Sequence, residues 1–280
     1  MAGSVAQRSS RSAVGVDDPV VDDAELEAAS VGGDLDTSVG KALALLEAFR
    51  TTCRPMGVTE LARLAHLPKS TAYRLLAILR QWNLVERSGS DYCLGKHLFE
   101  LGNLVPYCQP RGLRDVALPY LMRLYEASHE TVHLAVLDGT DVLYIEKIYG
   151  HNPCKAPTYV GSRMPVECAA LGKAMLAFSD KEAVLRVLSR GLQRVSPYTI
   201  VQPQHFVDEL GTIRREGVAF DREESTIGLT CVAAPVLGPG GKAIAAVSLA
   251  GPTYRFKPDE FAGRVREAAV GIAQDFQEVA

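Results

Sequence analysis

Residues 58–80 constrain the fold more than any other part of the chain. Their sequence, VTELARLAHLPKSTAYRLLAILR, predicts two short helices separated by a tight turn. The first helix is expected over residues 59–65, where the Thr59 hydroxyl can cap free backbone N–H groups. Pro68 marks the start of the second helix, because a proline there loses no hydrogen bond and has a suitable fixed φ. The chain is therefore expected to hold a compact helical pair near its N-terminus.

The second helix is predicted to have one buried face and one polar face. Ala72, Leu75, Leu76 and Leu79 recur at i, i+3, i+4 and i+7, the spacing of a buried stripe. Hydroxyl groups and cations project elsewhere, as in a helix that enters the DNA major groove N-terminus first. In an alternative interpretation, the hydroxyls cap the helix and the cations form a solvated face. The candidate DNA contacts in this helix are Lys69, Ser70, Thr71, Tyr73, Arg74 and Arg80.

The segments on either side favour the DNA interpretation. Residues 39–49, VGKALALLEAF, predict an apolar helix that can complete a three-helix core. Residues 84–94 read as two short strands joined by a Ser-Gly-Ser turn. Helices followed by such a hairpin are typical of a winged helix-turn-helix, in which Arg87 lies at the base of the wing near the DNA backbone or minor groove.

Charge is distributed unevenly along the chain. Residues 37–97 carry nine Lys or Arg against four Asp or Glu, whereas residues 1–36 carry two against eight. The remaining residues, 98–280, carry nineteen against twenty-one. The net charge of −3 therefore conceals a module of +5, and phosphate neutralisation makes that local charge the relevant quantity for DNA binding.

Composition also indicates the compartment. Residues 1–36 have no aromatic residue and no sustained apolar period, so a disordered tail is expected there. Neither the apolar core of a signal peptide nor a stretch long enough for a membrane span is present. The six cysteines show no CxxC spacing and are expected to be reduced thiols in a cytoplasmic protein, with no disulfide framework or zinc site. They are Cys53, Cys93, Cys108, Cys154, Cys168 and Cys231.

The rest of the chain is long enough for a second domain with its own core. We expect a tail over 1–36, a winged helix-turn-helix domain over 37–95, a helical connector over 96–110 and a second domain over 111–280. The second domain reads as α, ββ, α, α, α, ββ, α, which predicts an α+β fold with an antiparallel sheet flanked by helices. Such a layout often holds a small molecule beside the sheet. The expected helices cover residues 111–128, 172–178, 181–190, 205–216 and 258–279, and the strands cover 131–139, 141–150, 229–238 and 242–251.

Four segments in order resemble the IclR family of bacterial transcriptional regulators. GVTELARLAHLPKSTAYRLLAILRQWNLVER is similar to the family's helix-turn-helix and wing, and MPVECAALGKAMLA resembles its segment around an L-G-K-A-x-L-A core. GVAFDREESTIGLTCVAAPV and AIAAVSLAGP resemble two later family segments. The resemblance implies a dimer or dimer of dimers that binds a palindromic operator on double-stranded DNA, and a GAF-like C-terminal domain that senses a small metabolite.

The resemblance also implies an effector pocket. Two of its expected members, Ala170 and Cys231, can equally be small packing residues. The family positions that line the pocket fall here on Met164, Ala170, Leu171, Asp221, Cys231 and Ser248.

One position departs from the family. Members commonly have a histidine where this chain has Glu167. An acid near the sensing site weakens the case for an organic acid effector. An amine, an uncharged or aromatic ligand, or an outward-pointing Glu167 all remain open.

Motifs for catalysis are weak or incomplete. Residues 129–133, HETVH, match the HExxH zinc signature, but that chemistry needs a helix and the sequence becomes strand-like from Thr131. Two histidines four residues apart in a strand would be about 13 Å apart. Gly172 and Lys173 lack the upstream glycine of a phosphate-binding loop, and no G-x-S-x-G elbow occurs.

Adjacent carboxylates at Glu223 and Glu224 are expected to lie in a solvated turn, pointing apart. No catalytic residue, cofactor or metal is therefore expected, and no membrane partner. The alternative from another class is a small-molecule enzyme that keeps a vestigial DNA module.

Overall fold

The computed structural model describes residues 36–52, 54–151 and 158–279 and divides the chain into two compact units. The N-terminal unit ends at Leu101 and the C-terminal unit begins at Gly102, a boundary inside the predicted connector. Apart from Asp36, the predicted tail lies outside the described residues. Two of the six cysteines, at positions 53 and 154, also lie outside them, and the other four form no disulfide.

The N-terminal unit is a helical trio followed by a hairpin, as the sequence predicted. Thr37 caps the first helix by accepting a hydrogen bond of 3.0 Å from the backbone N–H of Gly40. The predicted stripe of α3 is buried against the other helices. The elements are α1 Ser38–Ala48, α2 Val58–Leu64, α3 Lys69–Gln81, β1 Val85–Ser88 and β2 Asp91–Leu94.

Two local details differ from expectation or refine it. Gly57 is the N-cap of α2, so Thr59 lies inside the first turn and its predicted capping role is wrong. In the wing, Ser88 pairs with Asp91, which leaves a two-residue turn. Gly89 has a φ of 64° in that turn, a left-handed conformation that glycine adopts without strain.

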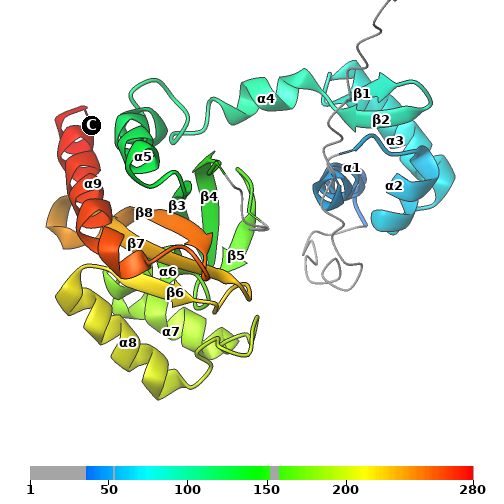
Figure 1. Ribbon diagram of the computed structural model, residues 1–280. Coiled ribbons are helices and arrows are strands. Elements are labelled where there is room, and N and C mark those ends of the chain that lie inside the picture. Colours follow the sequence, from blue (N-terminus) through cyan, green and yellow to red (C-terminus); the bar gives the residue numbers. More distant parts are fainter. Residues whose placement is uncertain (1–35, 53, 152–157, 280) are drawn as a thin grey trace, which may run out of the picture. The chain divides into compact units, whose positions relative to one another are not determined.

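The C-terminal unit is built on one antiparallel sheet with the strand order β5-β4-β3-β8-β7-β6 (Figure 1). β5 and β6 were not anticipated, because runs of three and four residues carry too little alternation to be recognised. The strands are β3 Thr131–Asp138, β4 Asp141–Ile148, β5 Arg163–Pro165, β6 Ala219–Arg222, β7 Leu229–Leu237 and β8 Ala243–Pro252.

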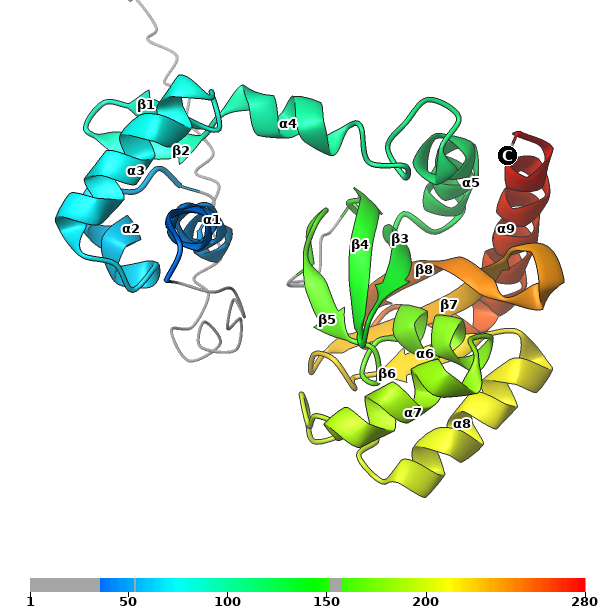
Figure 2. The same cartoon turned by 180° about the vertical axis from the view of Figure 1, so that it is seen from behind.

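Helices cover both faces of the sheet (Figures 1 and 2). α5 and α9 pack on one face, and α6, α7 and α8 pack on the other. Within the described residues, no helix combines the length and the apolar character that a membrane crossing requires. These helices are α5 Leu113–Ser128, α6 Ala170–Ala177, α7 Lys181–Arg190, α8 Pro203–Glu216 and α9 Pro258–Val279. Helix α4, Lys96–Gly102, precedes them at the boundary between the two units.

Helix α6 approaches the preceding chain closely at Gly172. A Cβ built there would lie 2.3 Å from the Val166 carbonyl oxygen and 2.7 Å from the Val166 Cα. These are backbone atoms, which cannot move aside as the end of a flexible side chain can. Close packing therefore accounts for this glycine.

Replacing this glycine should destabilise the protein. We expect Gly172→Ala to lower the free energy of unfolding by about 1–3 kcal/mol, as overpacking does. Gly211→Ala in α8 is the matched control, since nothing lies within 4 Å of its built Cβ. That change should stabilise by about 0.4–1 kcal/mol. Urea unfolding of both variants measures the two effects, and equal effects would contradict the packing explanation.

Candidate functional site

A pocket lies on the α6 side of the sheet, and strand alternation determines which side chains reach it. In β3, Leu134 and Val136 face α5 and α9, so His133 faces the other way. By the same rule Cys231 in β7 and Ser248 in β8 face the pocket. His133 lies directly opposite Ser248 in the sheet register. The pocket floor is therefore built from cross-strand neighbours.

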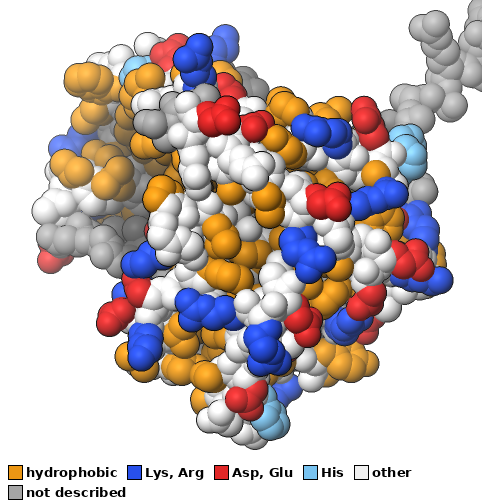
Figure 3. Space-filling model, turned by 90° about the vertical axis from the view of Figure 1, so that its left-hand side faces the viewer, with side chains coloured by type: hydrophobic (Ala, Val, Ile, Leu, Met, Phe, Trp, Pro, Cys, Tyr) orange, Lys and Arg blue, Asp and Glu red, His pale blue; other side chains and the backbone are white. Residues whose placement is uncertain are grey.

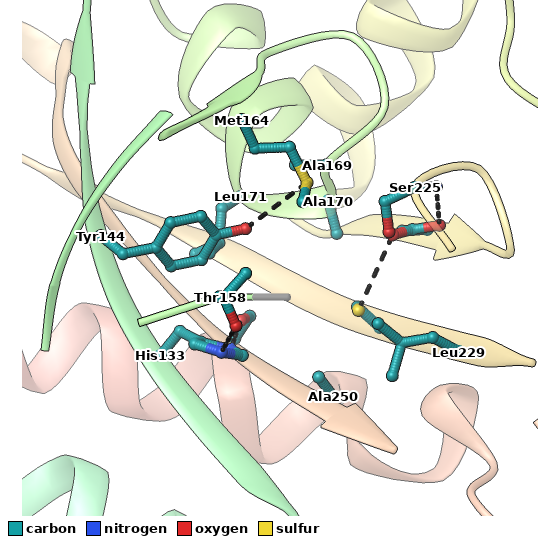
Figure 4. Close-up of a pocket in the computed structure, with 13 residues that line it drawn as sticks. His133, Tyr144, Thr158, Met164, Ala169, Ala170, Leu171, Ser225, Leu229 and Ala250 are labelled. Atoms are coloured by element: carbon teal, nitrogen blue, oxygen red, sulfur yellow. Dashed lines mark hydrogen bonds between the residues drawn. The ribbon is translucent and has the colours of Figure 1, made fainter. Parts of the chain in front are cut away.

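All six predicted effector positions line this pocket, whose cavity volume is about 20 Å³. They come from β5, α6, β6, β7 and β8, five elements that are separated in the sequence. Their placement agrees with the expected pocket, while their role as effector contacts stays a prediction. None of the described lining residues is Lys or Arg. The other lining residues, all labelled in Figure 4, are His133, Tyr144, Thr158, Ala169, Ser225, Leu229 and Ala250.

His133 is a neutral polar group in the pocket wall. Its side chain is 3 % exposed, and burial, with Lys147 nearby, lowers its pKa from 6.5 to about 3. Nε2 lies 2.9 Å from the Thr158 hydroxyl, and Nδ1 lies 3.5 Å from the Ser248 hydroxyl. The ring also packs edge-on against Tyr144, with centroids 5.2 Å apart. His133 is thus an uncharged hydrogen-bonding residue at neutral pH.

Asp221 holds the opposite wall in place. Its Oδ1 accepts hydrogen bonds from the backbone N–H groups of Glu224, at 2.7 Å, and Ser225, at 3.3 Å. Its Oδ2 accepts from the Ser225 hydroxyl and the Cys231 thiol. Burial raises the pKa of Asp221, and these hydrogen bonds act in the opposite direction. The main role of the Asp221 carboxylate is therefore to hold the segment after β6 in place, because its oxygens already accept hydrogen bonds from the protein.

Behind Asp221, a buried lysine secures the same loop. Lys173 is fully buried in α6, and its Nζ lies 2.6 Å from Oε1 of Glu224 and 3.4 Å from Oε1 of Glu209. Burial raises the pKa of Glu224, and Lys173 opposes that shift. The expectation of a solvated turn is thus wrong for Glu224, because Lys173 draws it inward. Glu223 does point elsewhere, and its φ of 64° makes the sharp turn.

Glu167 does not face the pocket. Its carboxylate is fully buried and accepts hydrogen bonds from the Arg190 guanidinium, at 2.6 Å, and the Gln193 backbone N–H, at 2.7 Å. Of the alternatives left open by the sequence, the structure agrees with a Glu167 that points away from the ligand site. Its charge is matched by Arg190 within the protein.

The HExxH residues do not share a helical face. His129 ends α5 in a left-handed conformation, whereas His133 lies in β3. The His129 ring instead contacts the rings of Tyr125 and His151. Among the described residues, no cluster of three or more His, Cys, Asp or Glu side chains can hold a metal.

Sequence reasoning missed His133, Tyr144 and Thr158 as members of the pocket. For the first two, a signal was present. The predicted strands 131–139 and 141–150 alternate, so one side of each had to face away from the α5 side. Thr158 directly follows residues 152–157, which lie outside the described residues. No sequence pattern indicated that Thr158 would line the pocket.

The predicted DNA contacts lie on the surface of the N-terminal unit. Lys69, Ser70, Arg74, Arg80 and Arg87 are exposed, and Thr71 is half-buried. Tyr73 is 58 % exposed, so this aromatic side chain is not part of the core. In the wing, the Arg87 guanidinium lies 5.3 Å from the centre of the Tyr92 ring.

The basic excess is confined to residues 37–97. On the face seen in Figure 3, cationic and anionic side chains are interspersed among apolar ones, without an extended patch of one sign. The counts for residues 98–280, nineteen basic against twenty-one acidic, are also nearly balanced. Electrostatic attraction to DNA phosphates therefore favours binding through the N-terminal unit.

The buried, neutral state of His133 predicts a pH dependence of stability. Between the native pKa of about 3 and an unfolded pKa near 6.5, only the unfolded chain binds a proton at this ring. Stability should therefore fall as pH falls, by about 1.4 kcal/mol per unit. Urea unfolding at pH 7 and pH 5 should show a loss about 2 kcal/mol larger in the wild type than in His133→Gln. Equal losses would contradict the assignment.

Family models match both units of the chain. The IclR helix-turn-helix domain matches residues 38–89, and the bacterial transcriptional regulator IclR C-terminal domain matches residues 105–275. The transcriptional repressor IclR of Escherichia coli is 34% identical over 240 residues, covering 83% of this chain and 87% of the repressor. The regulator KdgR of Dickeya chrysanthemi is 32% identical over 251 residues, covering 86% and 80%.

Solved structures agree with these matches. An IclR homolog from Microbacterium hydrocarbonoxydans, complexed with 4-hydroxybenzoate, has a TM-score of 0.79 at 29% identity and covers 86% of this chain and 100% of its own. IclR of Thermotoga maritima has a TM-score of 0.72 at 29% identity, covering 85% and 98%. The chain therefore belongs to the IclR family of bacterial transcriptional regulators, with a helix-turn-helix DNA-binding domain and a C-terminal ligand-binding domain.

Proposed function

We propose that a small molecule bound in the pocket of the C-terminal unit changes the affinity of the N-terminal unit for a palindromic operator. The observation that carries this proposal is the convergence of six residues, from segments far apart in the sequence, on one pocket. A ligand in this pocket can change the operator affinity only as far as its own affinity differs between the two states of the protein. The described residues 96–105 supply the connection between the two units.

The DNA contacts are proposed to come from the N-terminal half of α3, with help from the wing. Lys69, Ser70, Thr71, Tyr73 and Arg74 occupy the first turns of α3, where a recognition helix meets base edges. Arg80 and Arg87 are assigned to phosphates. Arg74 is well suited to guanine, because a guanidinium can donate two hydrogen bonds to O6 and N7.

Neutralising Arg74 should weaken operator binding. If Arg74 reads a guanine, Arg74→Ala costs about 1–3 kcal/mol, concentrated at one base position. If it contacts a phosphate instead, the loss is uniform over sequences and the salt slope falls by about 0.9. Arg186→Ala in α7 is the matched control, an exposed site with the same change of charge. Gel-shift titration at fixed salt that shows equal affinities for the two variants would reject the assignment.

A dimer or dimer of dimers is proposed as the binding form, since a palindromic operator calls for two-fold symmetry in the protein. Apolar side chains on the N-terminal unit support self-association. Val39 is 69 % exposed and Leu43 is 53 % exposed on α1, and Phe99 on α4 is 76 % exposed. Operator binding places the protein in the cytoplasm with the DNA.

The ligand is proposed to be a small aromatic or otherwise compact molecule that carries oxygen atoms. The walls combine apolar side chains, such as Met164, Leu171 and Leu229, with hydroxyl groups. The related Microbacterium protein binds 4-hydroxybenzoate, which makes that acid and its neutral amide the first probes. Because Glu167 is matched by Arg190, its charge does not argue against an organic acid.

Ligand binding should be visible as thermal stabilisation and should depend on the pocket volume. A ligand at 100 times its Kd stabilises by about 2.7 kcal/mol. Ala250→Leu, which places a larger side chain in the pocket from β8, should abolish the thermal shift. An undiminished shift in this variant would place the ligand elsewhere.

The pocket is proposed to bind its ligand without turning it over. Cys168 lies beside the site, but burial raises the pKa of its thiol far above the ordinary value, so it stays protonated. The neutral His133 and the saturated Asp221 carboxylate are likewise tied to protein partners. Turnover of a bound ligand would instead support an enzyme with a vestigial DNA module.

A further inference from the structure

The cations on the exposed side of α3 and in the wing have no carboxylate partner within the described residues. Residues 37–97 contain four acidic side chains, and all four are engaged elsewhere. Two pair with arginines outside α3 and the wing, and two accept hydrogen bonds from a backbone N–H and a hydroxyl. The pairs are Glu47 with Arg50 and Glu60 with Arg54, and the two acceptors are Glu86 and Asp91. The cations left without an ion pair are Lys69, Arg74, Arg80 and Arg87.

The opposite charge occurs in the same chain, just before α1. Residues 17–27, DDPVVDDAELE, contain six Asp or Glu and no Lys or Arg, and we call them the acidic segment. Residues 98–280 offer no comparable surplus, because their nineteen basic and twenty-one acidic side chains nearly balance. In net charge, the acidic segment is therefore the complement of the unpaired α3 cations.

The chain length between the acidic segment and α1 permits contact with α3. Residues 28–37 connect the two, and ten residues span at most about 35 Å. A compact unit of about 60 residues has a radius of gyration of only about 10 Å, and α1 packs against α3 in its core. Lys69 and Arg80 are about 16 Å apart along the helix axis. Eleven residues are long enough to follow α3 over that distance.

We propose that the acidic segment docks on the exposed side of α3 in the DNA-free protein and competes there with DNA phosphates. The contact is intramolecular, so dilution of the protein does not weaken it. Operator binding then requires that the segment be displaced, and the α3 cations exchange carboxylates for phosphates. The DNA half of this proposal rests on the proposed DNA contacts of α3.

Neutralising the acidic segment should tighten operator binding, most strongly at low salt. In the full-length protein, each Asp of residues 17–27 is replaced by Asn and each Glu by Gln, which removes six charges at constant chain length. We expect about tenfold tighter binding at about 50 mM salt, the gain for releasing four exposed ion pairs. The difference should nearly vanish at about 200 mM salt, because salt screens exposed pairs.

The matched control removes six negative charges from exposed positions of the C-terminal unit. It changes the net charge of the protein equally but leaves the acidic segment intact, so its gain in operator affinity should be much smaller. Equal gains in the two variants would show a general charge effect and overturn the proposal. The control replaces Glu126, Glu182, Asp208, Glu216, Glu267 and Glu278 by Gln or Asn.

Carbodiimide crosslinking of the full-length, DNA-free protein tests the contact directly. The reagent joins a carboxylate to a neighbouring lysine amine without a spacer, and Lys69 is the lysine of α3. We expect crosslinks from Lys69 to residues 17–27, with a yield that is independent of protein concentration and falls when operator is bound. Absence of these crosslinks would overturn the proposal. With mixed ¹⁵N-labelled and unlabelled protein, crosslinks between the two isotopes would assign the contact to a second copy and overturn the intramolecular assignment.

The two measurements separate failure of the contact from failure of the DNA assignment. If the crosslinks form but the neutralised variant binds operator no better than the control, the proposed competition is wrong. The effect of Arg74→Ala then decides whether α3 contacts the operator at all. If the crosslinks are absent and Arg74→Ala still weakens operator binding, the DNA assignment stands and the acidic segment has no part in it.

Discussion

The C-terminal unit depends on a central sheet whose two faces are both buried. One face packs under α5 and α9 and the other under α6, α7 and α8, so successive residues of β7 and β8 are nearly all apolar and inaccessible. Any polar side chain placed in such a sheet must find a partner, because an unsatisfied buried group is destabilising. The few polar residues on the α6 face, His133 and Ser248 among them, therefore come in contacting pairs. These pairs occur where the α6 packing is incomplete, and that is where the pocket lies.

A second layer of buried charge keeps the pocket wall in shape. The Asp221 carboxylate accepts a hydrogen bond from the backbone N–H of Glu224, and the Lys173 ammonium donates one to the Glu224 carboxylate. The Ser196 and Thr199 hydroxyls donate to the carbonyl oxygens of Glu223 and Glu224 at 2.6 and 2.7 Å. Removing one partner from such a set leaves an unpaired buried charge, which costs about 3–5 kcal/mol. The wall is thus rigid by construction, a property that favours a site able to discriminate between ligands.

The sequence predicted the elements with strong periodicity and failed where contacts between distant segments decide the outcome. The stripe of α3, the wing and the long helix α9 follow from local spacing. The six pocket positions came from family resemblance, whereas His133 and Tyr144 required knowing which strand face meets α6. Glu224 was placed in a solvated turn, since no local pattern could reveal that Lys173, 51 positions away, is buried beside it. Likewise, the acid at position 167 is neutralised by Arg190, a partner that adjacent sequence does not disclose.

The central claim is that occupancy of the pocket and occupancy of the DNA-binding surface are energetically coupled. Coupling between two binding sites is reciprocal, so the ligand must change operator affinity by the same factor by which operator changes ligand affinity. The most direct measurement is the ligand Kd of the full-length protein, free and saturated with operator, at one salt concentration. Our account predicts two different values, whose ratio equals the ratio of operator affinities with and without ligand. The same ligand Kd on and off the operator would contradict it.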